Sequence, residues 1–330
     1  MPLLTKKKSI YIPSFILNIR ATHQDTIDLI EKQFTARRFD RKLIQNDPEK
    51  CTINFYYYKV PFAEIPRSQN DCFKSFAIFH NEFWESDQIF LDVGPRMLKT
   101  IVDPETWSIT SYIATPPNFD QDLLFDLIFF QPIKHLLQMH GGFLFHSSCV
   151  VQNNKAVLFW GESGCGKTTL ALSLARSRFE YLSDDEVILS NDHTYVDCRP
   201  FPLKPKIRKE SLALFPEFKR RQATGGLKKQ KVLINGFFLK RTQWIVKPAV
   251  LILPRFSRTA KTRLEPVTRQ SALSCVMGQD GEFIKSVPHI WRHYFTVITQ
   301  LIRQCQVYRL HFKDQDLRQI PGMIKSVMRK

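Results

Sequence analysis

A glycine-rich stretch of nine residues offers the clearest chemistry in the sequence. It runs from Gly161 to Thr169, reads GESGCGKTT, and fits the pattern G-x-x-x-x-G-K-[ST]. Glycines let backbone N–H groups curl around anionic oxygens, and a helix that follows points its positive end at the same anion. The pattern therefore predicts a phosphate-binding loop.

The segments on both sides of this stretch support the prediction. Residues 156–160 (AVLFW) are typical of a buried strand, and residues 169–177 (TLALSLARS) are typical of a helix. In such a loop Lys167 would bridge the β- and γ-phosphates of a nucleotide, and the Thr168 hydroxyl would bind Mg²⁺. The alternative is a glycine-rich turn that binds nothing. The predicted nucleotide contacts are Gly161, Glu162, Ser163, Gly164, Cys165, Gly166, Lys167, Thr168 and Thr169.

Two adjacent carboxylates follow this helix between two apolar segments. Asp184 and Asp185 lie sixteen and seventeen residues after Thr168. Aspartates at strand ends beside a phosphate loop hold Mg²⁺. A pair also allows one carboxylate to take the proton of an attacking hydroxyl while the other binds the metal. The alternative is an acidic turn that only closes a strand.

One histidine precedes the loop on an apolar segment. His146 lies fifteen residues before Gly161, in the strand that we expect over residues 143–151. Two asparagines at 153 and 154 predict a turn into the strand over 156–160, which makes a hairpin with His146 near its start. Taken alone, a histidine on such a strand is more often a hydrogen-bonded core residue than a catalyst.

Together, His146, the loop and the acid pair resemble the catalytic core of HPr kinase/phosphorylase and its kinase-like relatives. The resemblance covers residues 143–190 strongly and the following segment weakly. It implies a P-loop domain similar to that of phosphoenolpyruvate carboxykinase, with ATP and Mg²⁺ as cofactors. It also implies that Asp184 is the base for the substrate hydroxyl, that Asp185 assists at the metal, and that His146 lies near the transferred phosphoryl group.

The sequence departs from that family in its first third, which does not resemble the family's N-terminal domain, and at two places in the core. HPr kinases continue the loop with Ser-Glu, whereas Thr168 and Thr169 follow Lys167 here, and the downstream Gly-Arg-Gly signature is not recognisable. The pattern is closer to related kinases that tailor lasso peptides or phosphorylate free serine. We therefore predict an ATP- and Mg²⁺-dependent kinase acting on a hydroxyl, chiefly a Ser of a peptide or protein. The alternatives are a small-molecule kinase for serine or a nucleoside-type hydroxyl, and a nucleotide-binding regulatory module without transfer activity.

The elements that must position these residues predict an α/β fold in two domains. A P-loop kinase domain of the HPr kinase and phosphoenolpyruvate carboxykinase type is expected over 119–330. A smaller mixed α+β domain is expected over 1–118, where we find no catalytic constellation. The boundary is set just before an apolar helical run, which Pro132 should kink and two glycines should end.

Composition limits the classes of binding partner and the cellular compartment that we expect for the protein. The chain has 330 residues and a net charge of +17, which admits an acidic partner, nucleic acid included, or a solvated lysine-rich surface. A basic loop over 219–231 lacks interleaved aromatic residues, which weakens the nucleic-acid interpretation. Seven cysteines without a C-x-x-C pair, no signal-peptide pattern and no apolar segment long enough to span a membrane predict a cytoplasmic protein. The family resemblance implies a homo-oligomer.

Overall fold

The computed structural model divides the chain into two units after Gly141, and each unit is described by itself. The structure describes residues 2–12, 15–34, 51–64, 74–77, 80–85, 88–93, 98–114, 120–191, 194–201, 203, 206–208, 211, 213–216, 222–223, 229–232, 245–257, 259, 261–278 and 288–329. The basic loop predicted over 219–231 and the segment that follows it therefore lie mostly outside the described residues.

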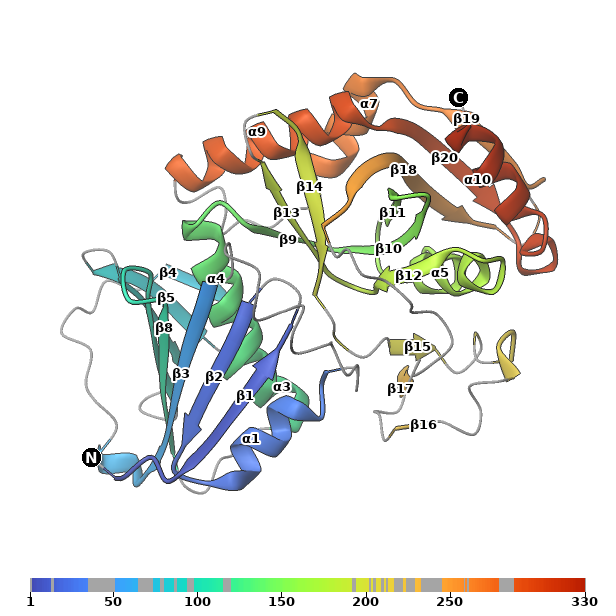
Figure 1. Ribbon diagram of the computed structural model, residues 1–330. Coiled ribbons are helices and arrows are strands. Elements are labelled where there is room, and N and C mark those ends of the chain that lie inside the picture. Colours follow the sequence, from blue (N-terminus) through green and yellow to red (C-terminus); the bar gives the residue numbers. More distant parts are fainter. Residues whose placement is uncertain are drawn as a thin grey trace. The chain divides into compact units, whose positions relative to one another are not determined.

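The first unit is built on a mixed sheet of eight strands in the order β1-β2-β3-β8-β7-β6-β5-β4 (Figure 1). The pairs β2–β3 and β3–β8 are parallel, and the other neighbours are antiparallel. Alternate residues of β3 are buried, which is the period of a strand with one face on a core. The strands are β1 (Lys6–Tyr11), β2 (Phe15–Ala21), β3 (Cys51–Val60), β4 (Lys74–Ala77), β5 (His80–Glu85), β6 (Gln88–Val93), β7 (Leu98–Asp103) and β8 (Ser108–Ala114).

The helical run before the loop domain belongs to this first unit. Its π-helical turn η2 packs on β3, since the Tyr57 hydroxyl donates to the Ile128 carbonyl at 3.1 Å and the Phe129 ring stacks on Phe55 at 5.0 Å. The division of the chain thus falls after Gly141, where φ is +75°, and not near residue 118. The helices of the unit are α1 (Gln24–Glu31), η1 (Phe62–Glu64), α3 (Gln121–Phe125), η2 (Asp126–Phe130) and α4 (Gln131–Met139).

The second unit contains a six-stranded sheet in the order β12-β10-β11-β18-β20-β19. Its three central strands β11, β18 and β20 run parallel, so their carboxyl ends meet at one edge. Two three-stranded sheets, β14-β13-β9 and β15-β17-β16, complete the unit. The strands are β9 (Phe143–Phe145), β10 (Ser147–Gln152), β11 (Lys155–Trp160), β12 (Glu180–Ser183), β13 (Val187–Asn191), β14 (Val196–Pro200), β15 (Lys206–Arg208), β16 (Gln222–Ala223), β17 (Lys229–Val232), β18 (Lys247–Phe256), β19 (Arg263–Pro266) and β20 (Gln306–Phe312).

Helices cover the central strands of the second unit. Residues of α5 and α10 share one buried core with Phe159, Ile252 and Phe312 from the parallel strands. Helix α9 contacts β13, β14, β18 and β20, and Figure 1 shows it on the other side of the sheet from α5. The unit is thus a mixed α/β structure, as predicted. Its helices are α5 (Lys167–Arg176), α7 (Arg269–Met277), α9 (Pro288–Gln304), η4 (Asp314–Asp316) and α10 (Ile320–Met328).

Two further observations bear on the expectations from composition. Cys149, Cys165, Cys198, Cys275 and Cys305 are all free thiols. Within the described ranges, none of the helices combines the length and the apolar character that crossing a membrane requires.

Candidate functional site

The glycine-rich stretch forms the expected connection from a strand to a helix. It leaves the carboxyl end of β11 at Trp160 and enters α5 at Lys167. Gly164 and Gly166 have φ values of +91° and +99°, which residues other than glycine rarely adopt. Gly166 also caps the helix in the left-handed conformation. The loop therefore has the backbone freedom and the adjoining helix start that an anion site uses.

The side chain of Lys167 reaches back to the beginning of this loop. The side chain is 6% exposed, and its Nζ donates to the carbonyl oxygens of Gly161 at 2.6 Å and Glu162 at 3.2 Å. These two acceptors are neutral. A phosphate oxygen would replace them with a charge-assisted hydrogen bond, which is the stronger kind. The ammonium group is therefore held at the loop in a position from which it can bind an anion.

Two chain crossings between sheets bring His146 and the acid pair together. The chain passes from β9 through His146 into β10, and from β12 through residues 184–186 into β13. Strand β9 pairs with β13, and β10 pairs with both β11 and β12, so the crossings lie side by side. Because Ser147 pairs with Trp160, His146 comes next to the start of the loop. The hairpin predicted around residues 153–154 is confirmed.

Asp184 is the buried centre of the site. Its carboxylate accepts hydrogen bonds from the hydroxyls of Ser148 on β10 and Thr168 on α5, the latter at 3.1 Å. The side chain is 1% exposed. Burial, and secondarily the charge of Asp185, raise the pKa of Asp184 from 3.8 to about 7. The network links the loop helix to the hairpin and places a titrating carboxyl group at their junction.

Asp185 and His146 form the more open side of the site. Asp185 has a φ of +64°, a left-handed conformation that Asp tolerates better than most residues. His146 Nδ1 lies 3.3 Å from Glu186 Oε1, and the imidazole is 46% exposed. The hydrogen bond with Glu186 raises the pKa of His146 against the opposing effect of burial, while the charges of Asp185 and Lys167 act in opposite directions. Asp185, Glu186 and Lys167 are therefore close enough to His146 to affect its pKa.

The structure brings together five of the predicted residues: His146, Lys167, Thr168, Asp184 and Asp185. Thr169 is buried, and its hydroxyl donates to Ser211 Oγ at 3.5 Å. Glu162, Ser163 and Gly164 are exposed, and Gly161, Cys165 and Gly166 are half-buried. Burial raises the pKa of the Cys165 thiol.

Sequence reasoning missed two residues of the site, Ser148 and Glu186. Ser148 donates to Asp184, and Glu186 is hydrogen-bonded to His146. The Ser183 hydroxyl donates to the carbonyl oxygens of Glu186 and Phe201 at 2.6 and 2.9 Å and fixes the turn. The available signal was proximity in sequence, because Ser148 stands two residues after His146 and Glu186 directly follows the acid pair.

The donor atoms at the site fit a hard cation that also binds phosphate. They are oxygens, from the Thr168 hydroxyl and the aspartate carboxylates, which Mg²⁺ prefers. No group of three or more His, Cys, Asp or Glu side chains that could hold a metal occurs among the described residues. Mg²⁺ is commonly bound by one or two carboxylates together with substrate phosphates, so a smaller donor set is sufficient for it.

Comparison with known proteins adds little. No protein-family model matches the chain, and no curated protein matches its sequence. Among solved structures, the chain is similar to the HPr(Ser) kinase/phosphatase from Coxiella burnetii, with 13% identity and a TM-score of 0.28. The match covers 56% of this chain and 95% of that one. A likeness at this score supports no argument about function.

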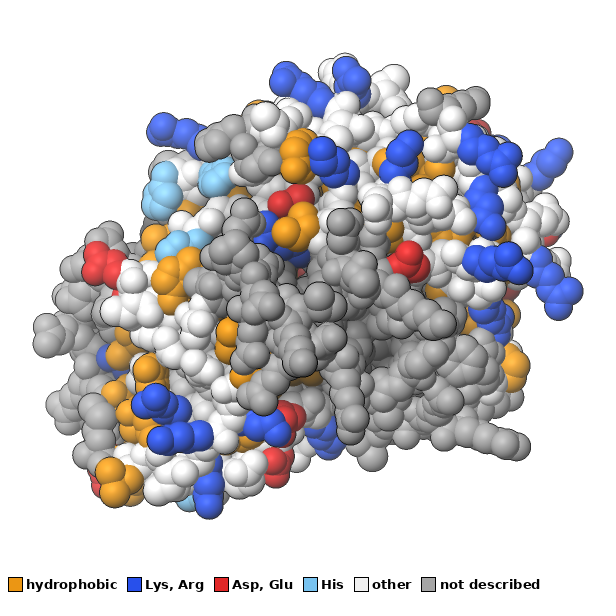
Figure 2. Space-filling view, viewed as in Figure 1, with side chains coloured by type: hydrophobic (Ala, Val, Ile, Leu, Met, Phe, Trp, Pro, Cys, Tyr) orange, Lys and Arg blue, Asp and Glu red, His pale blue; other side chains and the backbone are white. Residues whose placement is uncertain are grey.

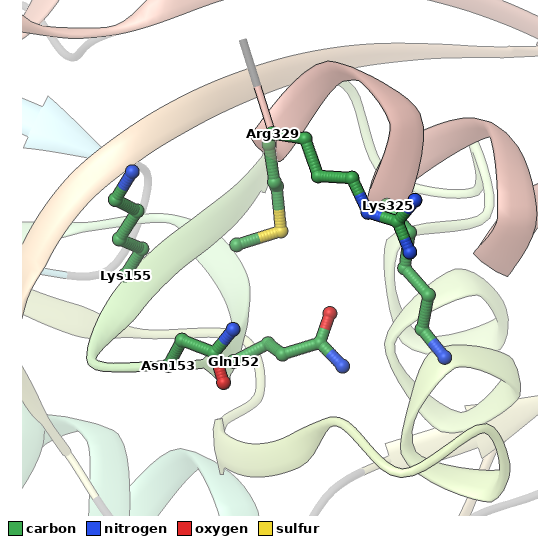
Figure 3. A pocket seen from close by; sticks show the side chains of 6 residues that line it. Gln152, Asn153, Lys155, Lys325 and Arg329 are labelled. Carbon is green, nitrogen blue, oxygen red and sulfur yellow. The ribbon is translucent and has the colours of Figure 1, made fainter.

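A separate pocket of about 260 Å³ opens at the other end of β11 (Figure 3). Lys155 lies on one side of it and Lys325 and Arg329 of the C-terminal helix region on the other. Figure 2 shows further Lys and Arg side chains along the side of the unit that carries β20 and α10. None of the predicted site residues lines this pocket, whose lining is Gln152, Asn153, Lys155, Lys325, Met328 and Arg329.

Proposed function

We propose that this chain is a kinase that transfers the γ-phosphoryl group of ATP to a hydroxyl, with a Ser of a peptide or protein as the preferred acceptor. The observation that carries the proposal is the network of Ser148, Asp184 and Thr168 beside Lys167. It joins a phosphate-type loop to a titratable carboxyl group. A loop that bound an anion without chemistry would not require a buried carboxylate of raised pKa.

The loop and Lys167 would hold the triphosphate. The first N–H groups of α5 lack partners within the helix and point towards the loop. Lys167 would leave the carbonyls of Gly161 and Glu162 for phosphate oxygens, because a charged acceptor binds an ammonium group more strongly. Mg²⁺, when bound, would neutralise charge that develops on the phosphates.

The contacts support a division of roles between the aspartates that is the reverse of the one implied by the family resemblance. Asp184 accepts from the hydroxyl of Thr168, which is the metal-binding hydroxyl of such loops, and both its oxygens are engaged. Asp185 is half-buried and its charge acts on His146. We therefore assign Asp184 to the metal side and Asp185 to the proton of the acceptor hydroxyl.

His146 would supply positive charge on the acceptor side. Its hydrogen bond with Glu186 raises the pKa, which favours the imidazolium form. A cation beside the transferred group stabilises the charge that the phosphoryl oxygens carry during transfer. His146 and Lys167 would then act from two sides of the same group.

Transfer of ³²P from labelled ATP to a panel of serine peptides, free serine and nucleosides tests the proposal. Asp185→Asn keeps the tolerance for a positive φ and removes the base, so we expect at least a hundredfold loss at every pH, as for the removal of other proton-transfer groups. Asp184→Asn should instead raise the Mg²⁺ concentration needed for half-maximal transfer. Asp197→Asn is the matched control, because Asp197 is also buried and accepts from a serine hydroxyl, that of Ser190.

The outcomes separate the assignments. Equal transfer by the wild type and Asp185→Asn would remove the base role from Asp185. A loss confined to Asp184→Asn at saturating Mg²⁺ would return that role to Asp184. Tight ATP binding without transfer to any acceptor would instead support a nucleotide-binding regulatory module.

A further inference from the structure

Three parallel strands of the second unit end side by side at the loop edge. Strand β11 leads into the loop, β18 ends at Phe256, and β20 ends at Phe312. Phe256 and Phe312 are register partners, so their side chains project from the same face of the sheet. Ligands of open α/β sheets bind outside the carboxyl ends of parallel strands. The ring of Phe256 therefore lies at the edge of the sheet from which the loop begins.

Phe312 packs directly against the backbone of the loop. A Cβ atom built on Gly166 would lie 2.5 Å from Phe312 Cζ, which is closer than real Cβ contacts come. The ring is 1% exposed and belongs to the core around α5. Gly166 is therefore required for two reasons, its positive φ and the ring that occupies the space beside it. The contact fixes the position of Phe312 relative to the loop.

Phe256 lies on the outer side of Phe312. The two rings meet edge to face, with centroids 5.6 Å apart and an interplanar angle of 68°. Phe256 is 38% exposed, and among the described residues only one other phenylalanine, Phe295 on α9, is a large exposed hydrophobic group. An aromatic ring that is held by a buried neighbour and open to solvent is a preformed stacking surface.

We propose that Phe256 is the stacking platform for the base of the nucleotide whose phosphates occupy the loop. This inference rests on the proposed function, because it takes the loop ligand to be a nucleoside triphosphate. Base–aromatic stacking is tolerant of base identity, since every base has a π-face. Phe256 would therefore add affinity for the nucleoside part of ATP or GTP and none for the phosphate chain, which the loop and Lys167 hold.

Calorimetric titration with Mg-ATP and with Mg-tripolyphosphate separates these two contributions. We expect Phe256→Ala to weaken Mg-ATP binding by roughly 5- to 150-fold, the range for loss of one stacked base. Tripolyphosphate lacks a base, so its affinity should stay within twofold. Phe256→Trp should keep ATP affinity, and Phe256→Leu, which retains apolar volume without a π-face, should lose much of it. Phe295→Ala is the matched control and should change the affinity for neither ligand.

Each result bears on the platform or on the kinase activity separately. An unchanged ATP affinity in both Phe256→Ala and Phe256→Leu would overturn the platform while leaving the kinase proposal standing. Equal losses for ATP and tripolyphosphate would also overturn it, because they indicate damage to the loop. If the wild type binds ATP but transfers no phosphoryl group, the platform stands and the kinase proposal falls. If the wild type binds tripolyphosphate as tightly as ATP, no base platform exists.

Discussion

The two ends of β11 both carry cations but differ in how those cations are held. At the carboxyl end, Lys167 is buried and donates two hydrogen bonds to the loop. At the amino end, roughly 20 Å away by the rise of six strand residues, Lys155 and Arg329 are exposed at the pocket. Lys325 is held more firmly than these two but less than Lys167, since its Nζ donates one hydrogen bond, to the Ser177 carbonyl at 3.1 Å.

The difference teaches that fixed neighbours, and not charge density, distinguish a candidate site from a cationic surface. The loop end combines a cation with strained backbone, a buried carboxylate and two hydroxyls of defined geometry. The other end places three cations around a pocket, and among the described residues their one hydrogen bond is that of Lys325 with the Ser177 carbonyl. Exposed charges lose most of their interaction energy to solvent and salt, whereas groups in a fixed, desolvated network keep it. The predictions below test this contrast.

The largest expected effect is at Lys167. Lys167→Ala removes a cation held at the loop, and transfer should fall by roughly 10²- to 10³-fold, the usual loss for one such donor. Lys325→Ala is the comparison at the other end, and its turnover should stay within twofold. Steady-state ATP turnover and thermal melting of both variants provide the measurement. A similar loss in the two variants would show that the contrast between the ends is not functional.

The next effect is on stability at Asp184. Its pKa in the folded protein is raised to about 7, so the folded state holds a proton that the unfolded chain releases near pH 4. Stability is therefore lost as pH rises from about 4 to about 7, by an amount on the order of a few kcal/mol. Asp184→Asn removes this penalty and should raise the melting temperature by several degrees at pH 8, with a difference that shrinks towards pH 5.

In the control variant for this prediction, we expect the melting temperature to change in the opposite direction. Asp197 accepts from Ser190 at 2.6 Å and pairs with Arg199 at 3.2 Å, so Asp197→Asn should lower the melting temperature at both pH values. Differential scanning calorimetry at pH 5 and pH 8 covers both variants. A lower melting temperature of Asp184→Asn at pH 8 would mean that its hydrogen bonds outweigh the cost of burying the charge.

The strand, the glycine-rich turn and the helix at the loop end agree with the sequence prediction because they are local. A strand, a glycine pattern and a helix within about twenty residues determine where Lys167 and Thr168 lie. The acid pair is also close in sequence, since only the short strand β12 separates it from the loop helix. Which of the two aspartates contacts Thr168 could not be predicted, because that contact depends on the pairing of β10 with β12.

Other features depend on contacts between distant segments. Ser148 gains its importance only from Asp184, thirty-six residues later. The division between units was placed too early because the apolar helix over 121–139 has no sequence feature that names its partner sheet. The helix belongs to the first unit because Ile128 accepts a hydrogen bond from Tyr57, which lies seventy-one residues earlier in the chain. Likewise, nothing in the sequence brings Phe256 and Phe312 together, since parallel strands are joined by long crossovers.

A smaller effect is expected at His146 when its partner is changed. Glu186→Gln removes the acceptor whose hydrogen bond raises the pKa of His146, so this pKa should fall and the imidazolium fraction near neutral pH should drop. Transfer should then decline more at pH 7.5 than at pH 6. Ring NMR titration measures the shift directly. His140 lies in the other unit and is the internal reference, because its pKa, which burial lowers, should not change. An unchanged pKa of His146 would show that Glu186 does not control it.

The smallest effect is expected from removing charge at the pocket end. In a Lys155→Ala, Arg329→Ala double variant, two exposed cations are lost roughly 20 Å from the loop by strand rise. The Debye length is about 8 Å at 0.15 M salt and about 30 Å at 0.01 M, so these cations should reach the loop only at low salt. ATP affinity should match the wild type at 0.15 M salt and weaken by less than threefold at 0.01 M. A loss that persists at 0.15 M would show that the pocket end is coupled to the loop through the sheet, because screening removes the direct path between them.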